Sequence, residues 1–212
     1  MNRACDRARN DVDMIVSTFK QKVGRPHTTM CDVGANVGNY TLWFLYRLPK
    51  SSVYAFEPVP DNYEVLVKNI ELNNFQSRVT AFNVGILNVS RLTTQDMFFP
   101  PERDALNTGL YSTQQFCEQQ EPSLTARFSS FSGCIDDIDL LQSGFDIAKI
   151  DVEGAECDVL TSSDSFILKS KCIYIEVNPS FVLVDAVKDM LSQQFECLSH
   201  VKNNELWQRR DV

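Results

Sequence analysis

The feature that most constrains the fold of this 212-residue chain is the regular alternation of short apolar runs with amphipathic segments. Strands are predicted at residues 28–34, 52–58, 78–85, 145–154 and 172–177, and helices at 4–22, 39–48, 61–70 and 181–194. The helix at 61–70 is expected to start with an Asp61 cap and a capping-box Glu64. Such alternation is typical of an α/β domain with a mainly parallel sheet, which residues 195–200 and 205–209 would close as a hairpin.

Length, composition and charge restrict the domain organisation and the partners. The length suits one domain over residues 1–212, with an N-terminal helical segment at 1–27. A formal net charge of -8 disfavours nucleic acid and anionic lipid as partners. No apolar run approaches the roughly 20 residues of a membrane-spanning helix. Seven cysteines without a CxxC pair favour reduced thiols, and we expect a cytoplasmic protein.

The segment CDVGANVGNYT (31–41) combines a strand, a glycine-bearing turn and a helix start. This order is typical of the nucleotide-binding corner of doubly wound folds. Gly34 and Gly38 allow a sharp turn and a close approach to a ligand. Glu57 ends the second strand, about 20 residues beyond Gly38, where an acid that binds ribose hydroxyls is expected. The two features together predict a nucleoside-binding site.

Two nucleoside cofactors are candidates for this site. An NAD fingerprint has three glycines, whereas Asn36 and Asn39 replace the second and third here. Asp32 adds a negative charge where the diphosphate would lie. S-adenosylmethionine has a ribose, no phosphate and a cationic methionyl end, so the residues favour it. An NAD-dependent oxidoreductase and a catalytically silent binding module remain the alternatives.

A second acidic cluster, AKIDVEGAE (148–156), follows the fourth predicted strand. Asp151 and Glu153 fall at the carboxyl end of that strand, where open α/β sheets bind ligands. A carboxylate there could accept the proton of a hydroxyl that is being methylated. Lys149 joins them as a catalytic candidate, although it would also suit a buried partner for an acid. Asp151, Glu153 and Glu176 could instead hold Mg²⁺, but we favour a metal-free route.

The segment 91–134 departs from the alternating pattern. It is long, rich in Ser, Thr, Gln and Pro, and poorly periodic, with β-like pieces at 92–99 and 126–132. Loops of this length in compact domains are typically lids or binding loops. We therefore expect an insertion that covers the acceptor substrate.

Several motifs of this chain resemble the FkbM-type S-adenosylmethionine-dependent methyltransferases. In family order they are DVGANVGNYT, AFEP, the pair Asn69 and Asn73, NTG at 107–109, DD at 136–137, KIDVEGAE and IEV. The most specific is KIDVEGAE. The resemblance implies a Rossmann-like methyltransferase fold, with helices on both faces of a mainly parallel seven-stranded sheet that ends in an antiparallel strand. It also implies O-methylation of a small-molecule or glycan acceptor.

The resemblance further implies which residues would bind the donor and which would face the transferred methyl group. The donor-binding residues would be Asp32, Gly34, Ala35, Asn36, Gly38 and Asn39 on the methionyl side, Glu57 and Pro58 at the ribose, and Asn83 and Val84 at the adenine. Asp151 and Glu153 would face the methyl group. Many members carry a histidine near the position of Glu176, whereas this chain has Asn178, so we expect no base from that strand.

Overall fold

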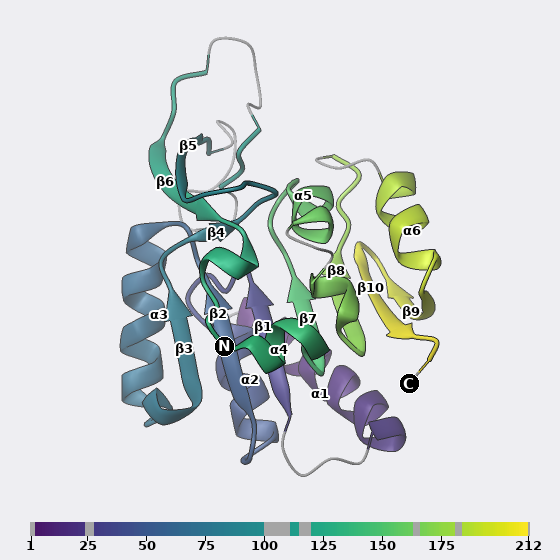
Figure 1. Ribbon diagram of the computed structural model, residues 1–212. Helices are drawn as coiled ribbons and strands as arrows, with labels where there is room; N and C mark the ends of the chain where they lie inside the picture. Colours follow the sequence, from purple (N-terminus) through teal and green to yellow (C-terminus); the bar gives the residue numbers. More distant parts are fainter. Residues whose placement is uncertain are drawn as a thin grey trace.

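The computed structural model describes residues 3–23, 28–99, 111–114, 120–162, 166–180 and 184–211. Its centre is a seven-stranded sheet in the order β3-β2-β1-β7-β8-β10-β9 (Figure 1). The strands are β1 (Thr29–Val33), β2 (Ser52–Phe56), β3 (Val79–Phe82), β7 (Ile147–Ile150), β8 (Cys172–Glu176), β9 (Phe195–Val201) and β10 (Asn204–Arg209). Pairing is parallel from β3 to β8, and β10 pairs antiparallel with β8 and β9. The predicted mainly parallel sheet with a C-terminal hairpin is confirmed.

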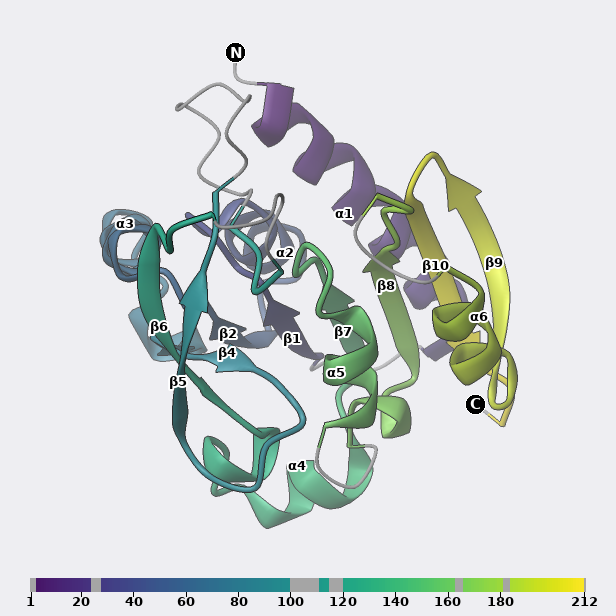
Figure 2. The same ribbon diagram turned by 90° about the horizontal axis from the view of Figure 1, so that it is seen from above.

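Helices lie on both faces of this sheet (Figure 2). One face carries α1 (Arg3–Val23), α2 (Asn39–Arg47) and α3 (Pro60–Leu72), and the other carries α4 (Ile138–Ser143), α5 (Glu156–Thr161) and α6 (Val184–Ser192). Each face has its own buried apolar core, in which Phe44 and Leu66 belong to the first and Val159 and Leu191 to the second. Short 3-10 helices occur at η1 (Gln76–Arg78), η2 (Phe131–Gly133) and η3 (Phe166–Lys169). None of the helices in the described ranges is long and apolar enough to cross a membrane.

The start of α3 differs from the prediction. The helix begins at Pro60, with Val59 at the N-cap position, and no side chain caps it. A proline suits the first helical position because its fixed φ is helical and no amide donor is needed there. The predicted Asp61 cap with Glu64 was therefore wrong. Asp61 lies in the first turn of α3, where its negative charge interacts favourably with the positive end of the helix dipole.

The segment after β3 forms a second, three-stranded sheet in the order β4-β6-β5. It contains β4 (Gly85–Ile86), β5 (Thr93–Met97) and β6 (Leu124–Ser129), and the two longer strands overlap the β-like pieces predicted at 92–99 and 126–132. The strand predicted at 78–85 was too long, since β3 ends at Phe82. A Cβ on Gly85 would lie 2.3 Å from the Phe128 ring, so the close pairing of β4 and β6 needs glycine there.

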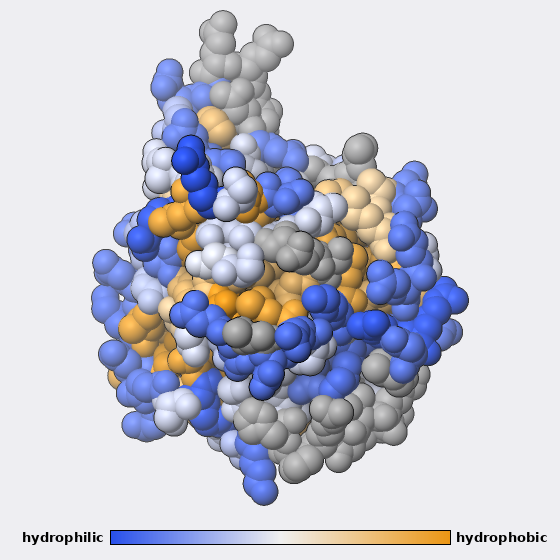
Figure 3. Space-filling model, in the orientation of Figure 1, coloured by the Kyte–Doolittle hydropathy of each residue, from blue (hydrophilic) through white to orange (hydrophobic). Residues whose placement is uncertain are grey.

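The lobe formed by β5 and β6 stands beyond the carboxyl ends of β1 and β2 (Figure 1). Figure 3 shows hydrophobic residues gathered across the middle of this face, with hydrophilic residues around them. The NTG motif at 107–109 falls outside the described residues. The lobe thus adjoins the edge of the sheet at which ligands bind in open α/β folds.

Candidate active site

The glycine-bearing turn after β1 packs directly against the end of β7. Gly34, Asn36 and Gly38 all have positive φ angles, of 77°, 51° and 92°. The amides of Gly34 and Ala35 both donate to the Phe56 carbonyl, at 3.0 Å each. A Cβ on Gly34 would lie 1.9 Å from the backbone oxygen of Asp151. The structure therefore brings the two clusters predicted from the sequence, 31–41 and 148–156, into contact, and this contact requires glycine at position 34.

The carboxylate of Glu57 is built into the same turn. Its Oε2 accepts the Asn36 amide at 2.7 Å, and its Oε1 accepts the Val59 amide at 2.9 Å. The side chain is buried, and burial raises the pKa of Glu57 to about 7, although the hydrogen bonds from Val59, Asn36 and Asn62 oppose that rise. Glu57 is thus an oriented acceptor that loses its charge just below neutral pH.

The residues expected at the adenine lie beside Glu57. The Asn83 amide donates to the backbone oxygens of Glu57 and Pro58, at 3.0 and 3.3 Å. Arg127 on β6 donates in turn to the Asn83 backbone oxygen at 3.2 Å, and Val84 is buried. The ends of β2 and β3 and one strand of the lobe therefore meet at this point.

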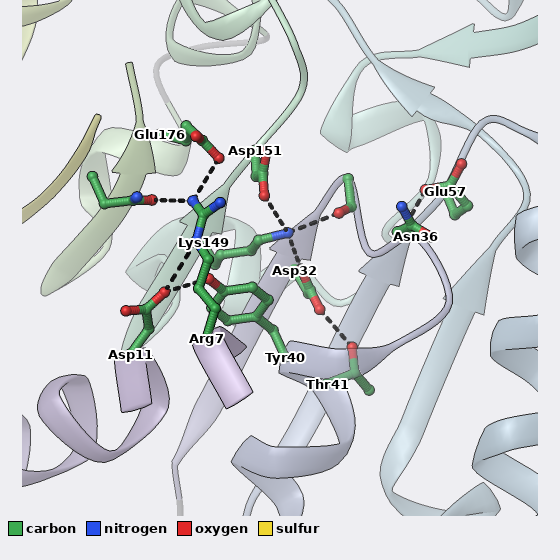
Figure 4. Close-up of polar contacts among 12 residues, drawn as sticks. Arg7, Asp11, Asp32, Asn36, Tyr40, Thr41, Glu57, Lys149, Asp151 and Glu176 are labelled. Carbon is green, nitrogen blue, oxygen red and sulfur yellow. Dashed lines mark hydrogen bonds and ion pairs between the residues drawn. The ribbon is translucent and has the colours of Figure 1, made fainter. Parts of the chain in front are cut away.

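Asp32 lies behind the turn and not on its surface (Figure 4). Its side chain is completely buried, accepts the Thr41 hydroxyl at 2.6 Å and lies 3.1 Å from the Lys149 ammonium. The same ammonium donates to the Gly34 carbonyl at 2.7 Å and lies 4.9 Å from the centre of the Tyr40 ring. Asp32, which the resemblance placed on the methionyl side of the donor, is thus buried against Thr41 and Lys149.

Lys149 is held as a cation by its neighbours. Burial on its own would lower the pKa of Lys149, but Asp32 and Asp151 outweigh burial and raise that pKa above its usual value. A lysine that keeps its proton cannot serve as a base. Of the two sequence interpretations, the geometry agrees with the buried partner for neighbouring acids.

Asp151 and Glu176 meet at the adjacent carboxyl ends of β7 and β8 (Figure 4). Asp151 Oδ2 lies 3.8 Å from Lys149, and its side chain is 28% exposed. Glu176 shares a hydrogen bond with Asp151, and burial together with the Asp151 charge raises the pKa of Glu176. Arg7 on α1 donates to Glu176 Oε2 at 2.8 Å. Asp151 is therefore an accessible carboxylate within a paired group of charges.

The trio Asp151, Glu153 and Glu176 does not form a cluster of the kind that holds a metal. Within the described ranges, no group of three or more histidine, cysteine, aspartate or glutamate side chains is arranged for a metal ion. Glu153 has a positive φ of 49° in the turn after β7. The magnesium alternative thus has no support in the geometry of these three residues.

Part of the predicted covering insertion contacts the turn after β7. The buried Ser112 hydroxyl donates to the Glu153 carbonyl at 2.7 Å, and the Gln114 side chain donates to the Gly154 carbonyl at 3.1 Å. Ser112 also pairs with Phe98, at the end of β5. These bonds connect the lobe to the backbone that carries Asp151.

Sequence reasoning missed two charged residues of this site. Arg7 belongs to no motif, and its only signal is an i,i+4 spacing to Asp11, 3.7 Å away. Glu156, at the start of α5, is 1% exposed. Its Oε1 accepts the Gly154 amide at 3.1 Å, and its Oε2 has no hydrogen-bond partner among the described residues. Burial raises the pKa of Glu156 to about 7, helped by the charges of Asp151 and Glu176.

The Glu156→Gln variant is expected to gain stability relative to the wild type as pH rises. The pKa of Glu156 is about 7 in the folded protein and 4.5 in the unfolded chain. Glu156 therefore contributes stability below pH 4.5 that is lost as pH rises through 7. Glutamine removes that dependence, so the difference in unfolding free energy should shift by about 1–3 kcal/mol between pH 5 and 8. Urea unfolding at both pH values measures it. The control is Glu64→Gln, at an exposed carboxylate; an equal difference at both pH values would contradict the assignment.

Comparison with known proteins identifies the family of this chain. The sequence matches the Methyltransferase FkbM domain over residues 32–197, which is most of the chain. The chain belongs to the FkbM methyltransferase family. S-adenosylmethionine is accordingly its cofactor, and the NAD-dependent alternative receives no support. The resemblance drawn from the sequence motifs is confirmed.

Two fungal relatives are similar in sequence to this FkbM-family chain. Methyltransferase 1 of Beauveria bassiana is 30% identical over 150 residues, which cover 63% of this chain and 57% of that protein. Methyltransferase sdnD of Sordaria araneosa is 30% identical over 158 residues, covering 63% and 59%. The matched part of the chain thus spans less than two thirds of either relative.

Solved structures share the fold. The Streptococcus pneumoniae protein Sp1610, in complex with S-adenosyl-L-methionine, superposes with a TM-score of 0.54 at 10% identity, over 99% of this chain and 73% of that one. A protein of the NADB-Rossmann superfamily from Streptococcus agalactiae gives a TM-score of 0.54 at 12% identity, over 99% and 68%. At such low identity the similarity shows a Rossmann-like fold alone.

Proposed function

We propose that this chain is an S-adenosylmethionine-dependent O-methyltransferase that acts on a hydroxyl of a small-molecule or glycan acceptor. The observation that carries the proposal is the position of Asp151. Asp151 follows β7, and its carboxylate is accessible. Its backbone oxygen packs against Gly34 in the turn after β1. When bound, S-adenosylmethionine supplies an electrophilic methyl group, and a hydroxyl nucleophile must then lose a proton.

The donor side of the proposal rests on the turn and on Glu57. An ionised carboxylate has about four acceptor positions, and the Asn36 and Val59 amides and the Asn62 side chain occupy three of those of Glu57. The remaining position suits a hydroxyl donor of the ribose. The residues that we assign to the donor are Gly34, Ala35, Asn36, Gly38, Asn39, Glu57, Pro58, Asn83 and Val84. This chemistry fits the cofactor of the family.

Two of the site residues predicted from the sequence, Asp32 and Lys149, are proposed to have positioning roles. Asp32 is buried behind the turn, and Lys149 connects it to the Gly34 carbonyl and to Asp151. We propose that this pair holds the turn and the base in register without touching either substrate. Asp151 then accepts the hydroxyl proton, and Glu153, in the next turn, lines the acceptor side.

The lobe is proposed to cover the acceptor within this single domain. Ser112 and Gln114 bind the backbone carbonyls of Glu153 and Gly154, so the segment 91–134 contacts the turn next to the base. A small acceptor that reaches Asp151 would therefore meet the lobe. We propose no nucleic acid as acceptor, because the net charge of -8 opposes a polyanion.

Donor binding is expected to weaken as pH falls below 7. Protonation of Glu57, whose pKa is about 7, converts an acceptor of ribose hydroxyls into a donor. The dissociation constant of S-adenosylhomocysteine should therefore rise about tenfold per pH unit below that value. Calorimetric titration between pH 5.5 and 8 measures it. The Glu57→Gln variant is the control: it should bind weakly with a flat profile, and a flat profile in the wild type would contradict the ribose assignment.

The reaction itself is tested by transfer of a labelled methyl group to matched acceptors. A panel of polyols and sugars, with their amino and thiol analogues, is incubated with labelled S-adenosylmethionine. We expect label in a methyl ether of the hydroxyl compounds. Label only in amines or thiols would contradict O-methylation. Donor binding without transfer to any compound would favour the catalytically silent module.

A further inference from the structure

Arg7 contacts Glu176 of the candidate site from outside the part of the chain that matches the family. It lies on α1, ahead of residue 32, where the match begins. Its Nη2 donates to Glu176 Oε2 at 2.8 Å and to Asn204 Oδ1 at 3.1 Å, and Asn204 on β10 lies beyond residue 197, where the match ends. Arg7 therefore joins two segments outside the family match to a carboxylate inside it.

The position of Arg7 is set by packing and by a second polar contact. α1 buries Val12, Ile15 and Val16 in the core that it shares with α2 and the sheet. One turn from Arg7, Asp11 accepts the Tyr40 hydroxyl at 2.6 Å and lies 3.7 Å from Arg7 Nε. Figure 4 shows the guanidinium between Asp11 and Glu176. The packing of α1 thus holds the guanidinium in one orientation against Glu176.

The charge of Asp151 disfavours the ionised form of Glu176. A cation at Glu176 favours that ionised form, whereas its loss would keep Glu176 protonated to higher pH. Beside these two carboxylates, the charged and titratable groups that act on the pair from the surrounding elements are Arg7 and Asp11 on α1, Tyr40 on α2, Lys149 on β7 and Glu156 on α5. Arg7 is the cation that contacts Glu176 directly.

We infer that Arg7 is a positioning residue for the reaction: it holds Glu176 ionised and oriented, which leaves Asp151 able to take the acceptor proton at neutral pH. This inference rests on the proposed role of Asp151 as the base. Arg7 acts through Glu176 and touches neither the acceptor nor the donor. The helix α1 thereby becomes part of the catalytic apparatus of this chain.

A titration that requires no turnover tests the inference first. The side-chain carboxyl ¹³C shifts are followed from pH 4 to 9 in the full chain, and the Glu176 signal is assigned by its loss in Glu176→Gln. Arg7→Met should raise the pKa of Glu176 by at least one unit, whereas Arg7→Lys should keep it within about half a unit of the wild type. An unchanged pKa in Arg7→Met would overturn the inference.

The pH profile of turnover gives the second readout. In Arg7→Met the acidic limb of kcat should move up by about one unit, with a loss that approaches about tenfold at pH values below the limb of the wild type and is recovered at pH 9. The matched control is Arg9→Met, on the same helix, whose guanidinium lies over the Trp43 ring; its profile should equal that of the wild type. A uniform loss at all pH values would assign Arg7 a structural role only.

The two hypotheses fail in different ways. A wild type that transfers no methyl group to any acceptor contradicts the proposed function, while the carboxyl titration still decides the role of Arg7 toward Glu176. An active wild type whose profile is unaffected by Arg7→Met contradicts the inference alone. The double variant Arg7→Met with Glu176→Gln should match Glu176→Gln, because the effect of Arg7 passes through Glu176.

Discussion

The Asp151→Asn variant is expected to lose turnover by about 100-fold to 10,000-fold and to bind the donor almost as tightly as the wild type. Asparagine keeps the size and the hydrogen-bonding capacity of the side chain but cannot accept a proton at neutral pH. The side chain is 28% exposed and lies 3.8 Å from Lys149, so the change leaves no unpaired group in the core. Initial rates with labelled S-adenosylmethionine, together with calorimetry of S-adenosylhomocysteine, separate the two effects.

The matched control for this variant is Asp158→Asn. Asp158 is an exposed carboxylate on the adjoining helix α5, so its replacement changes net charge by the same amount at a short distance. We expect its turnover to stay within about twofold of the wild type. If Asp151→Asn also kept normal turnover, the acceptor proton would be removed by another group, and Asp151 would drop out of the mechanism.

The Lys149→Met variant is expected to lose about 3–5 kcal/mol of unfolding free energy. Methionine preserves the length of the side chain but leaves Asp32 completely buried without its cation, while the hydrogen bond from the Thr41 hydroxyl remains. It also removes the bond to the Gly34 carbonyl that ties β7 to the turn. A buried carboxylate without its cation costs far more than the pair contributes, which is why the predicted loss is large. Urea unfolding at pH 7.5 measures it.

Two further variants test whether that loss of stability comes from the buried pair of charges. Lys68→Met removes an exposed lysine from α3, 3.9 Å from Glu64, and should change stability by less than about 0.5 kcal/mol. The double variant Lys149→Met with Asp32→Asn removes both buried charges and should recover much of the stability. A loss in Lys149→Met no larger than that in Lys68→Met would show that the two buried charges are not coupled as the structure has them.

The sequence was sufficient to predict the sheet and the glycine-bearing turn at which the candidate site lies. Residues 28–34 and 145–154 were predicted as strands from the short apolar runs that they contain, and β1 and β7 are found within these ranges. Glycines at 34 and 38 predicted a tight turn, and the positive φ angles there confirm it. The position of Glu57 beside this turn follows from the parallel pairing of β1 with β2, which brings their carboxyl ends together.

What the sequence did not predict concerns the direction and the depth of side chains. Asp32 and Lys149 sit opposite each other on paired strands, so both side chains lie on the same face and are buried together. A motif shows that these residues occur but not which of them reach the surface. Arg7 was missed because its partner Glu176 is 169 positions away, and no periodicity links such distant residues.

The most direct test of the account is a calorimetric titration of S-adenosylhomocysteine into the wild type, Glu57→Ala and Asp151→Asn at pH 8. At this pH the Glu57 carboxyl, with its pKa of about 7, is ionised. We predict clear binding to the wild type and to Asp151→Asn, and at least tenfold weaker binding to Glu57→Ala, which loses the charge-assisted hydrogen bond to the ribose. Equal binding to the wild type and to Glu57→Ala would contradict the donor site proposed for this chain.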